Sequence, residues 1–314
     1  MKKFIRKMTI LVTALVAINL LLLCAVPKDK NGYLCEYKDK IQLLDSVSQP
    51  RIIFIGGSSV AFGTDSKTIG DSLHCNVVNF GLHGGIGIRY PLDDALQYIG
   101  KGDVVVLQFE YGNFFSGGNG EAETFPRFMV ENDWRNFDRL NFKQWEYILS
   151  GIPMEALKNL KRLAVFLLRG SFDTPTVNNK FMYVKSGFNE YGDEVSHLSY
   201  PSVEYSSSNK TNTKQVHSEF MSWLADAITK YEQAGATVIM LPPVCVESHF
   251  KATYNDNVEQ ALKEINHPYL VSPESMVVDD SCSFNTGYHM NEEGVRQNTT
   301  NIITTLKQLE IVPN

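Results

Sequence analysis

Short apolar runs alternate with longer amphipathic segments along most of the chain beyond residue 50. The runs lack the in-and-out alternation of a half-exposed strand, which is typical of strands buried on both faces of a parallel sheet. The alternation of strand-like and helix-like segments indicates βαβ units in an α/β fold. The predicted strands span residues 51–55, 76–80, 103–109, 236–241 and, in a less marked pattern, 268–271. The predicted helices span residues 86–99, 214–233, 256–265 and 292–309.

The amino-terminal residues differ from this pattern. Four basic side chains, Lys2, Lys3, Arg6 and Lys7, precede an uncharged run over residues 8–26. As a helix rising ~1.5 Å per residue, this run is about 28 Å long, close to the thickness of a hydrocarbon core. Because it is longer than the apolar core of a cleaved signal and lacks a clear cleavage site, residues 1–26 predict an uncleaved anchor, with a cleaved signal as the alternative. Basic residues before the span place everything after it outside the cytoplasm.

The rest of the chain divides into a polar segment and a large domain. Residues 27–50 are polar and predict a juxtamembrane stalk with one short helix. The α/β domain is expected to span residues 51–314. Within it, residues 114–212 break the rhythm of strands and helices, and a structureless loop of that length is uncommon in a compact domain. We therefore expect an inserted helical cap there.

Composition excludes some classes of function. The 314 residues carry a formal net charge of −6 without a long basic run, which argues against nucleic acid as a partner. The spacing of Cys35, Cys75, Cys245 and Cys282 matches no zinc motif, so we expect neither a metal site nor a cofactor. Outside the cytoplasm these cysteines can pair as disulfides, or each can be a small buried apolar residue.

Polar motifs follow the first three predicted strands. Gly56 and Gly57 come directly after the first strand and permit a tight turn that presents Ser58. NFGLHGG, which contains Gly84, follows the second strand, and EYGN, which contains Asn113, follows the third. Because the carboxyl ends of parallel strands meet at one edge of a sheet, these segments are expected to gather there.

The order of these motifs, with His289 in YHMN near the end of the chain, resembles the SGNH/GDSL hydrolase superfamily over roughly residues 51–120 and 236–309. GGSSVAFG, NFGLHGG, GDVVVLQFEY, FNEYGD and YHMNEEG together look like the membrane-anchored SGNH-type proteins of bacterial envelopes and polysaccharide clusters. The resemblance implies a three-layer α/β/α fold with a flavodoxin-like parallel sheet of about five strands. It places the four family residues on Ser58, Gly84, Asn113 and His289.

These residue types suit acyl-ester chemistry. Ser58 supplies the nucleophilic hydroxyl, with Ser59 as the second candidate, and His289 is the base. The backbone N–H groups of Ser58 and Gly84 and the side-chain amide of Asn113 are expected to form the oxyanion hole, where losing one donor typically costs about 3 kcal/mol.

The chain departs from the family at the residue that orients the histidine. The superfamily places an aspartate three residues before it, where this chain has Thr286, and the anchored relatives place an acid four before, where it has Asn285. Asn285 can accept the Nδ1 proton of His289 but lacks the charge that stabilises imidazolium. Asp279 and Asp280 are alternative orienting acids, and a Ser–His dyad that uses a backbone carbonyl is a third option.

Three further residues near the motifs have two interpretations each. His83 packs beside the site or binds substrate. Glu110 and Tyr111 either support the Asn113 turn or line the pocket, and support is the favoured interpretation.

The sequence thus predicts a membrane-anchored SGNH-type esterase or O-acyltransferase whose catalytic domain lies outside the cytoplasm of a bacterial cell. Its expected reaction is O-acyl transfer or O-deacylation on an envelope or secreted carbohydrate, with an acyl donor or acylated carbohydrate as partner. A membrane-bound acyltransferase is a further candidate partner. Two alternatives stay open: a catalytically weakened binding or scaffold protein of an envelope assembly, and an esterase or thioesterase for membrane lipid.

Overall fold

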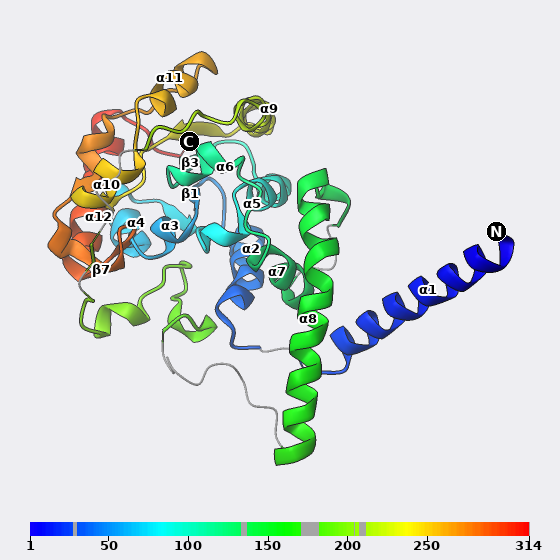
Figure 1. The fold of residues 1–314 in the computed structure, drawn as a ribbon. Coiled ribbons are helices and arrows are strands. Elements are labelled where there is room, and N and C mark those ends of the chain that lie inside the picture. Colours follow the sequence, from blue (N-terminus) through cyan, green and yellow to red (C-terminus); the bar gives the residue numbers. More distant parts are fainter. Residues whose placement is uncertain (28–29, 133–136, 171–181, 204, 207–211, 314) are drawn as a thin grey trace.

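A computed structural model describes the chain except residues 28–29, 133–136, 171–181, 204, 207–211 and 314 (Figure 1). It is a mixed α/β structure in which a parallel sheet lies among helices and an apolar helix projects at the amino terminus. The helices are α1 (Lys2–Cys24), α2 (Glu36–Ser46), α3 (Ser58–Ala61), α4 (Ser66–Leu73), α5 (Arg89–Ala95), α6 (Gly112–Ser116), α7 (Thr124–Asn132), α8 (Phe142–Arg169), α9 (Ser218–Gln233), α10 (Glu247–Thr253), α11 (Asn257–Glu264) and α12 (Glu292–Gln308). The strands are β1 (Arg51–Gly56), β2 (Asn76–Asn79), β3 (Val104–Gln108), β4 (Thr237–Met240), β5 (Cys245–Val246), β6 (Val277–Val278), β7 (Ser283–Thr286) and β8 (His289–Met290).

The main sheet has four parallel strands in the order β2–β1–β3–β4. These are the first four predicted strands, so the parallel α/β sheet is confirmed. The fifth predicted segment, 268–271, forms one isolated parallel bridge between Tyr269 and Met240. Pro268 has no N–H to donate to a strand ladder, which helps explain why the segment forms no longer pairing. The prediction of about five strands therefore overstates the sheet by this segment.

Alternate residues of each strand enter two different hydrophobic clusters. Ile53 of β1 and Val105 of β3 pack in one cluster with residues of α2, α5 and α9. Ile52 and Val104 pack in the other cluster with residues of α4 and α12. Both faces of the sheet are therefore covered by apolar side chains, which explains why the strands appear in the sequence as continuous apolar runs.

Helix α2 lies in the segment that the sequence suggested as a stalk. Its side chains Tyr37, Ile41 and Leu44 are buried against the sheet core at helical spacing. Lys40 is also buried, and its Nζ donates hydrogen bonds to the backbone oxygens of Asn79, at 2.9 Å, and Gly192. The folded domain therefore begins before residue 51, and the stalk prediction overlooked an apolar stripe because polar residues surround it.

Of the four helices predicted at 86–99, 214–233, 256–265 and 292–309, three are confirmed, whereas α3, α4 and α10 were not predicted. Helices α9, α11 and α12 lie within the predicted ranges 214–233, 256–265 and 292–309. The predicted helix 86–99 is instead divided into the short helix α5 and two single 3₁₀ turns. Gly87 has φ +73°, and a Cβ there would lie 2.3 Å from the nitrogen of Gly120. This close approach of two backbones ends the first turn and prevents a continuous helix.

The inserted region contains helices, but a different, irregular part of it contacts the motif residues. Helix α8 packs against α7 and α1 and lies between the body of the domain and the projecting α1 (Figure 1). The described residues 182–200, which form no α-helix, return to the sheet edge. There Asn79 donates a backbone hydrogen bond to Tyr191, and its side chain donates to Asp193. The part of the insertion that reaches the motif residues is thus this irregular segment.

Helix α1 is long and apolar enough to cross a membrane. Most of its surface is exposed, and only its last turn packs against the domain, where Leu23 contacts Val130 and Ala156. An exposed apolar helix of about 34 Å, at ~1.5 Å per residue, matches a bilayer core.

Candidate active site

Ser58 lies at the carboxyl edge of the main sheet. Strand β1 ends at Gly56, and helix α3 begins at Ser58 after Gly57. A Cβ on Gly56 would lie 2.3 Å from the backbone oxygen of Gln108, so glycine is needed where β1 passes β3. Ser58 is partly exposed whereas Ser59 is 1% exposed. Of the two serines, Ser58 is therefore the one accessible to a substrate.

His289 of β8 lies next to Ser58. Its Nε2 is 2.8 Å from Oγ of Ser58. Burial is the largest cause that lowers the pKa of His289 to about 3, and the neighbouring imidazoles of His197 and His83 add to the effect. The ring of Phe62 stacks on the His289 ring with 4.1 Å between centroids. At neutral pH the imidazole is therefore neutral and able to accept the proton of Ser58.

Asn285 of β7 lies on the other side of the His289 ring. Its Oδ1 is 2.8 Å from Nδ1 of His289 and accepts the hydrogen bond from the Nδ1–H tautomer, which leaves Nε2 free to accept from Ser58. The Asn285 amide donates to the hydroxyl of Tyr183 at 2.7 Å, and this hydroxyl lies 3.3 Å from Nδ1 of His289. The structure thus brings Ser58, His289 and Asn285 into one chain of hydrogen bonds, in the order expected from the sequence.

The two alternative orienting acids lie elsewhere. The carboxylate of Asp279 accepts from the hydroxyl of Ser281 at 2.6 Å and from its N–H at 2.9 Å, and these bonds lower the pKa of Asp279. The carboxylate of Asp280 accepts from the N–H of Ser248 at 2.9 Å. Both aspartates are exposed. The Asp279 bonds hold a local turn and the Asp280 bond holds the start of α10, so Asn285 is the candidate among the three that contacts His289.

The carboxyl of Glu110 lies beside the candidate nucleophile. Its Oε1 accepts a hydrogen bond from the N–H of Ser59 at 3.0 Å and lies 3.2 Å from Oγ of Ser58, where it competes with Nε2 of His289 for the single proton of that hydroxyl. Burial raises the pKa of the Glu110 carboxyl, although the bonds from Ser58 and Ser59 oppose this change. A Cβ on Gly84 would lie 2.9 Å from Oε2 of Glu110. Gly84 therefore gives room to this carboxyl, which lines the site beside the serine.

The side-chain amide of Asn113 is hydrogen bonded within its own turn. This residue lies on α6, and its amide donates to the backbone oxygen of Glu110 at 3.1 Å. Tyr111 is buried, and its backbone N–H donates to the hydroxyl of Tyr288 at 3.0 Å. In this structure Asn113 and Tyr111 hold the turn that carries Glu110, whereas Glu110 itself contacts Ser58.

His83 packs beside the site. Its Nδ1 accepts the N–H of Gly85 at 2.8 Å, so the ring proton is on Nε2. Burial lowers the pKa of His83. Its ring lies edge-on to Tyr33, with 6.0 Å between the centroids. This geometry favours a packing role for His83 over a second base.

Several residues that hold the site were missed by the sequence analysis. Nδ1 of His197 is hydrogen bonded to the carboxyl of Glu194, and its Nε2 lies 2.8 Å from the backbone oxygen of Met290, next to His289. The carboxyl of Asp193 accepts from Ser66 and Asn79. Asp193 belongs to the FNEYGD motif, which was noted without a role, but nothing in the sequence marks Tyr183 or His197 as neighbours of His289.

The cysteine thiols form none of the hydrogen bonds described for this site. Cys75, Cys245 and Cys282 carry free thiols, and burial raises the pKa of Cys245. Within the described parts of the chain, no group of three His, Cys, Asp or Glu side chains could hold a metal ion.

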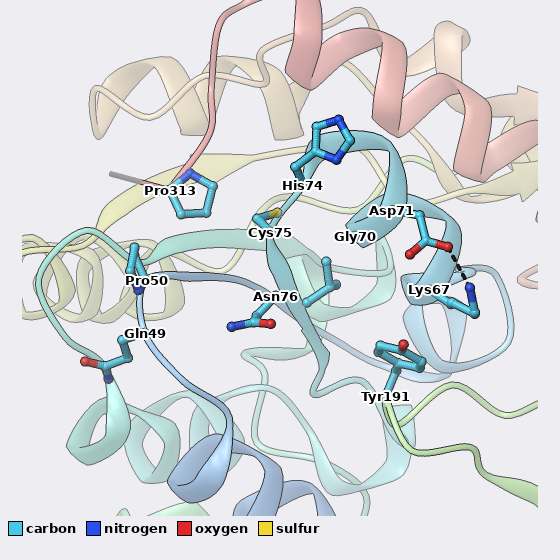
Figure 2. Close-up of a pocket in the computed structure, with 11 residues that line it drawn as sticks. Gln49, Pro50, Lys67, Gly70, Asp71, His74, Cys75, Asn76, Tyr191 and Pro313 are labelled. Carbon is cyan, nitrogen blue, oxygen red and sulfur yellow. Dashed lines mark hydrogen bonds and ion pairs between the residues drawn. The ribbon is translucent and has the colours of Figure 1, made fainter.

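A surface hollow of ≈ 630 Å³ lies at the opposite edge of the sheet, around the beginning of β2 (Figure 2). Figure 2 shows His74 and Pro313 at its border and the ion pair of Lys67 with Asp71 on its wall. Ser58 follows the carboxyl end of β1, so this hollow is separate from the serine site.

The geometry around Ser58 contains a hydroxyl, a neutral imidazole and an amide oxygen in sequence, with a buried carboxyl at the serine. Such an arrangement can activate a hydroxyl for attack on an acyl carbon. Comparisons with protein-family models, with curated protein sequences and with solved structures find no match to this chain.

Proposed function

We propose that this chain is a serine-dependent enzyme of SGNH type that transfers or removes acyl groups on an envelope or secreted carbohydrate. The observation that carries the proposal is the hydrogen-bonded series from Ser58 through His289 to Asn285, with 2.8 Å at each step. Ser58 thus meets His289, 231 positions further along the chain, and Asn285 in the order that nucleophilic acyl chemistry needs.

The reaction follows from the atoms in this series. Oγ of Ser58 attacks the carbonyl carbon of an ester or thioester while Nε2 of His289 takes the hydroxyl proton. The tetrahedral intermediate collapses, and His289 returns the proton to the leaving oxygen or sulfur, which leaves an acyl group on Ser58. Water or a sugar hydroxyl then attacks this acyl-enzyme, with His289 again as base. Hydrolysis and transfer differ only in this acceptor.

Glu110 has a direct part in this proposal. A substrate carbonyl oxygen must lie near Oγ of Ser58 and accept from neighbouring N–H groups. Oε1 of Glu110 now lies 3.2 Å from that Oγ and accepts from the N–H of Ser59. Substrate binding therefore requires the carboxyl to move aside, after which the N–H groups of Ser58, Ser59 and Gly84 are the candidate oxyanion donors. Asn113 joins them only if its amide turns from the backbone oxygen of Glu110.

The fold supports the same proposal. The order β2–β1–β3–β4, continued by the bridge from Met240 to Tyr269, is compatible with a flavodoxin-like sheet. Helices α2, α5 and α9 pack with one set of strand residues and α4 and α12 with the other, as a three-layer α/β/α arrangement requires. We include this layering, and the SGNH family itself, in the proposal.

The location proposed for the enzyme rests on α1. The four basic residues at its start favour a cytoplasmic amino terminus, so the domain would lie outside the cytoplasm. There it would meet acylated carbohydrates, and a membrane-bound acyltransferase that supplies acyl groups is a compatible partner.

A fluorophosphonate probe tests the proposal on the full-length protein in detergent. It should label Ser58, and the adduct should be absent from the variant Ser58→Ala. The variant Ser59→Ala is the matched control, because Ser59 is buried one residue away, and it should keep the label. Labelling that is lost in Ser59→Ala but kept in Ser58→Ala would contradict the assignment of the nucleophile.

A second candidate function is a binding or scaffold protein on the same fold. Two observations favour it: the Glu110 carboxyl is hydrogen bonded to the Ser58 hydroxyl and the Ser59 N–H, and Asn285 lacks the charge of an orienting acid. An unlabelled Ser58 both in the wild type and in Glu110→Ala would favour this candidate. A labelled enzyme that prefers phospholipid or acyl thioesters to acetylated sugars would instead favour the lipid esterase.

A further inference from the structure

Helix α8 carries an exposed apolar stripe that nothing in the described chain covers completely. Leu149, Leu157, Leu160 and Leu167 recur three to eight residues apart, which places them on one side of the helix. Leu149 is 67% exposed and Leu167 is 75% exposed. The buried Ile148, one residue before Leu149, lies about 100° round the helix and packs on the domain, and the buried Ala156, seven residues after Leu149 and four before Leu160, lies at the edge of the stripe. A helix of 28 residues thus has one side in the protein and one apolar side outside it.

Basic residues lie beyond one edge of this leucine stripe. Helix α8 has five basic and two acidic side chains, in a chain whose net charge is −6. Lys158, Lys161, Arg162 and Arg169 all lie in its second half. By helical spacing Lys161, four residues after Leu157, borders the stripe on the side away from Ala156, and the other three lie further round the helix. An apolar stripe beside a cationic flank is typical of helices that lie in the interface of a membrane rather than across it.

The end of α1 fixes where α8 lies relative to a membrane. The Asn159 amide donates to the backbone oxygen of Leu22 at 3.2 Å, and Arg162 donates to the backbone oxygen of Pro27 at 3.1 Å. Leu23 packs on Ala156. The last turn of the apolar span is therefore held against the middle of α8, and Figure 1 shows α8 between the domain and the projecting span. If α1 crosses a bilayer, α8 lies where the hydrocarbon core meets the headgroups.

We propose that α8 is a membrane-surface helix, whose leucine stripe enters the lipid layer crossed by α1 and whose basic flank binds anionic phospholipid headgroups. Two features favour lipid as the occupant of this surface. The helix adjoins the span, and its basic flank has the charge opposite to that of anionic lipid. The helix then holds the domain against the outer face of the membrane in one orientation. This inference rests on α1 as a span and is independent of the chemistry at Ser58.

Photolabelling from within the lipid tests this inference. The full-length protein is reconstituted in vesicles of equal parts phosphatidylcholine and phosphatidylglycerol that contain a lipid with a diazirine on its acyl chain, and adducts are mapped by mass spectrometry. We expect adducts on α1 and on the leucine stripe of α8, and none on α12, which serves as the control helix. Adducts on α1 alone would overturn the inference. Adducts on neither helix would overturn both the span and the inference.

A charge variant tests the basic flank. Lys158→Gln combined with Lys161→Gln should lower the α8 labelling, measured relative to α1 in the same sample, at least about threefold. Vesicles of phosphatidylcholine alone should have the same effect on the wild type. Lys251→Gln on α10 is the matched control, since Lys251 is an exposed lysine on another helix, and it should change nothing. Equal α8 labelling in all these samples would overturn the headgroup part of the proposal.

Discussion

Replacing Asn285 by aspartate should strengthen the base at the candidate site. Oδ1 of Asn285 lies 2.8 Å from Nδ1 of His289, so a carboxylate there would directly face the imidazolium that forms when His289 takes the serine proton. Asn285 is only partly buried, and the Tyr183 hydroxyl at 2.7 Å can donate to a carboxylate, so the new charge would stay ionised. The change keeps the shape of the side chain and adds the missing charge.

The size of the effect follows from this distance. An opposite charge within about 4–6 Å typically raises the pKa of a base by about 1–3 units. The pKa of His289, which burial lowers to about 3, should therefore rise to about 4–6 in Asn285→Asp. Each unit corresponds to ~1.4 kcal/mol. We expect formation of the covalent adduct at Ser58 to become at least about tenfold faster at neutral pH, a decrease of roughly 1.4 kcal/mol in the barrier.

The assay is the rate of fluorophosphonate labelling between pH 4 and 8. In the wild type, protonation of His289 should change the rate little over this range, because the pKa of His289 is about 3. In Asn285→Asp the rate should fall as the pH decreases through the raised pKa of His289. Asn291→Asp is the matched control: it adds the same charge two residues from His289, where Asn291 caps α12 through the N–H of Gly294 at 3.1 Å.

An unchanged rate together with an unchanged pH profile in Asn285→Asp would refute the orienting role of Asn285. A large loss in Asp279→Asn or Asp280→Asn would then move that role to an aspartate. We expect both of these variants to keep the wild-type rate, because their carboxylates bind Ser281 and Ser248.

Three further predictions concern Glu110, Lys40 and the topology. Glu110→Ala should label at Ser58 about tenfold faster, because an incoming carbonyl no longer displaces a hydrogen-bonded carboxyl, whereas Glu110→Gln should label like the wild type; a slower Glu110→Ala would make the carboxyl part of the catalytic machinery. Burial raises the pKa of Glu110, so its contribution to stability is present at low pH and is lost as the pH rises; the thermal unfolding temperature should therefore decrease less with rising pH in Glu110→Gln than in the wild type. Lys40→Met should lower the free energy of unfolding by about 2–4 kcal/mol in a denaturant titration, because two buried carbonyls lose their donor, whereas the exposed Lys38→Met should change it little. A reporter fused after Asn314 should be active outside the cytoplasm, and a cytoplasmic signal would contradict the proposed orientation.

The sequence predicted the parts of this fold that depend on local pattern. Four buried strands and three helices follow directly from apolar runs and helical periodicity. Helix α2 was missed as part of the domain because Tyr37 and Ile41 lie among charged residues. One of these, Lys40, is itself buried, since two backbone oxygens from distant segments accept its hydrogen bonds. The local sequence pattern does not predict such distant hydrogen-bond partners.

The candidate site was also predicted only in part from the sequence. Ser58 and His289 were found from their motifs, and they lie 231 positions apart along the chain yet within hydrogen-bond distance. The pattern could not show that the Asn113 amide turns to the oxygen of Glu110 or that Tyr183 binds Asn285. These contacts depend on side-chain rotation and on an irregular segment, which sequence periodicity does not describe.

The two departures from a charged triad have a common electrostatic consequence. Behind His289, Asn285 supplies an acceptor without charge, and in front of Ser58, burial favours the neutral form of Glu110. A charged Glu110 beside Ser58 would repel a forming oxyanion and raise the barrier. Attack by Ser58 is therefore favoured when the carboxyl of Glu110, moved aside for the substrate, is also neutral. An uncharged site also keeps His289 neutral, so the same burial that weakens it as a base keeps it available to accept the serine proton.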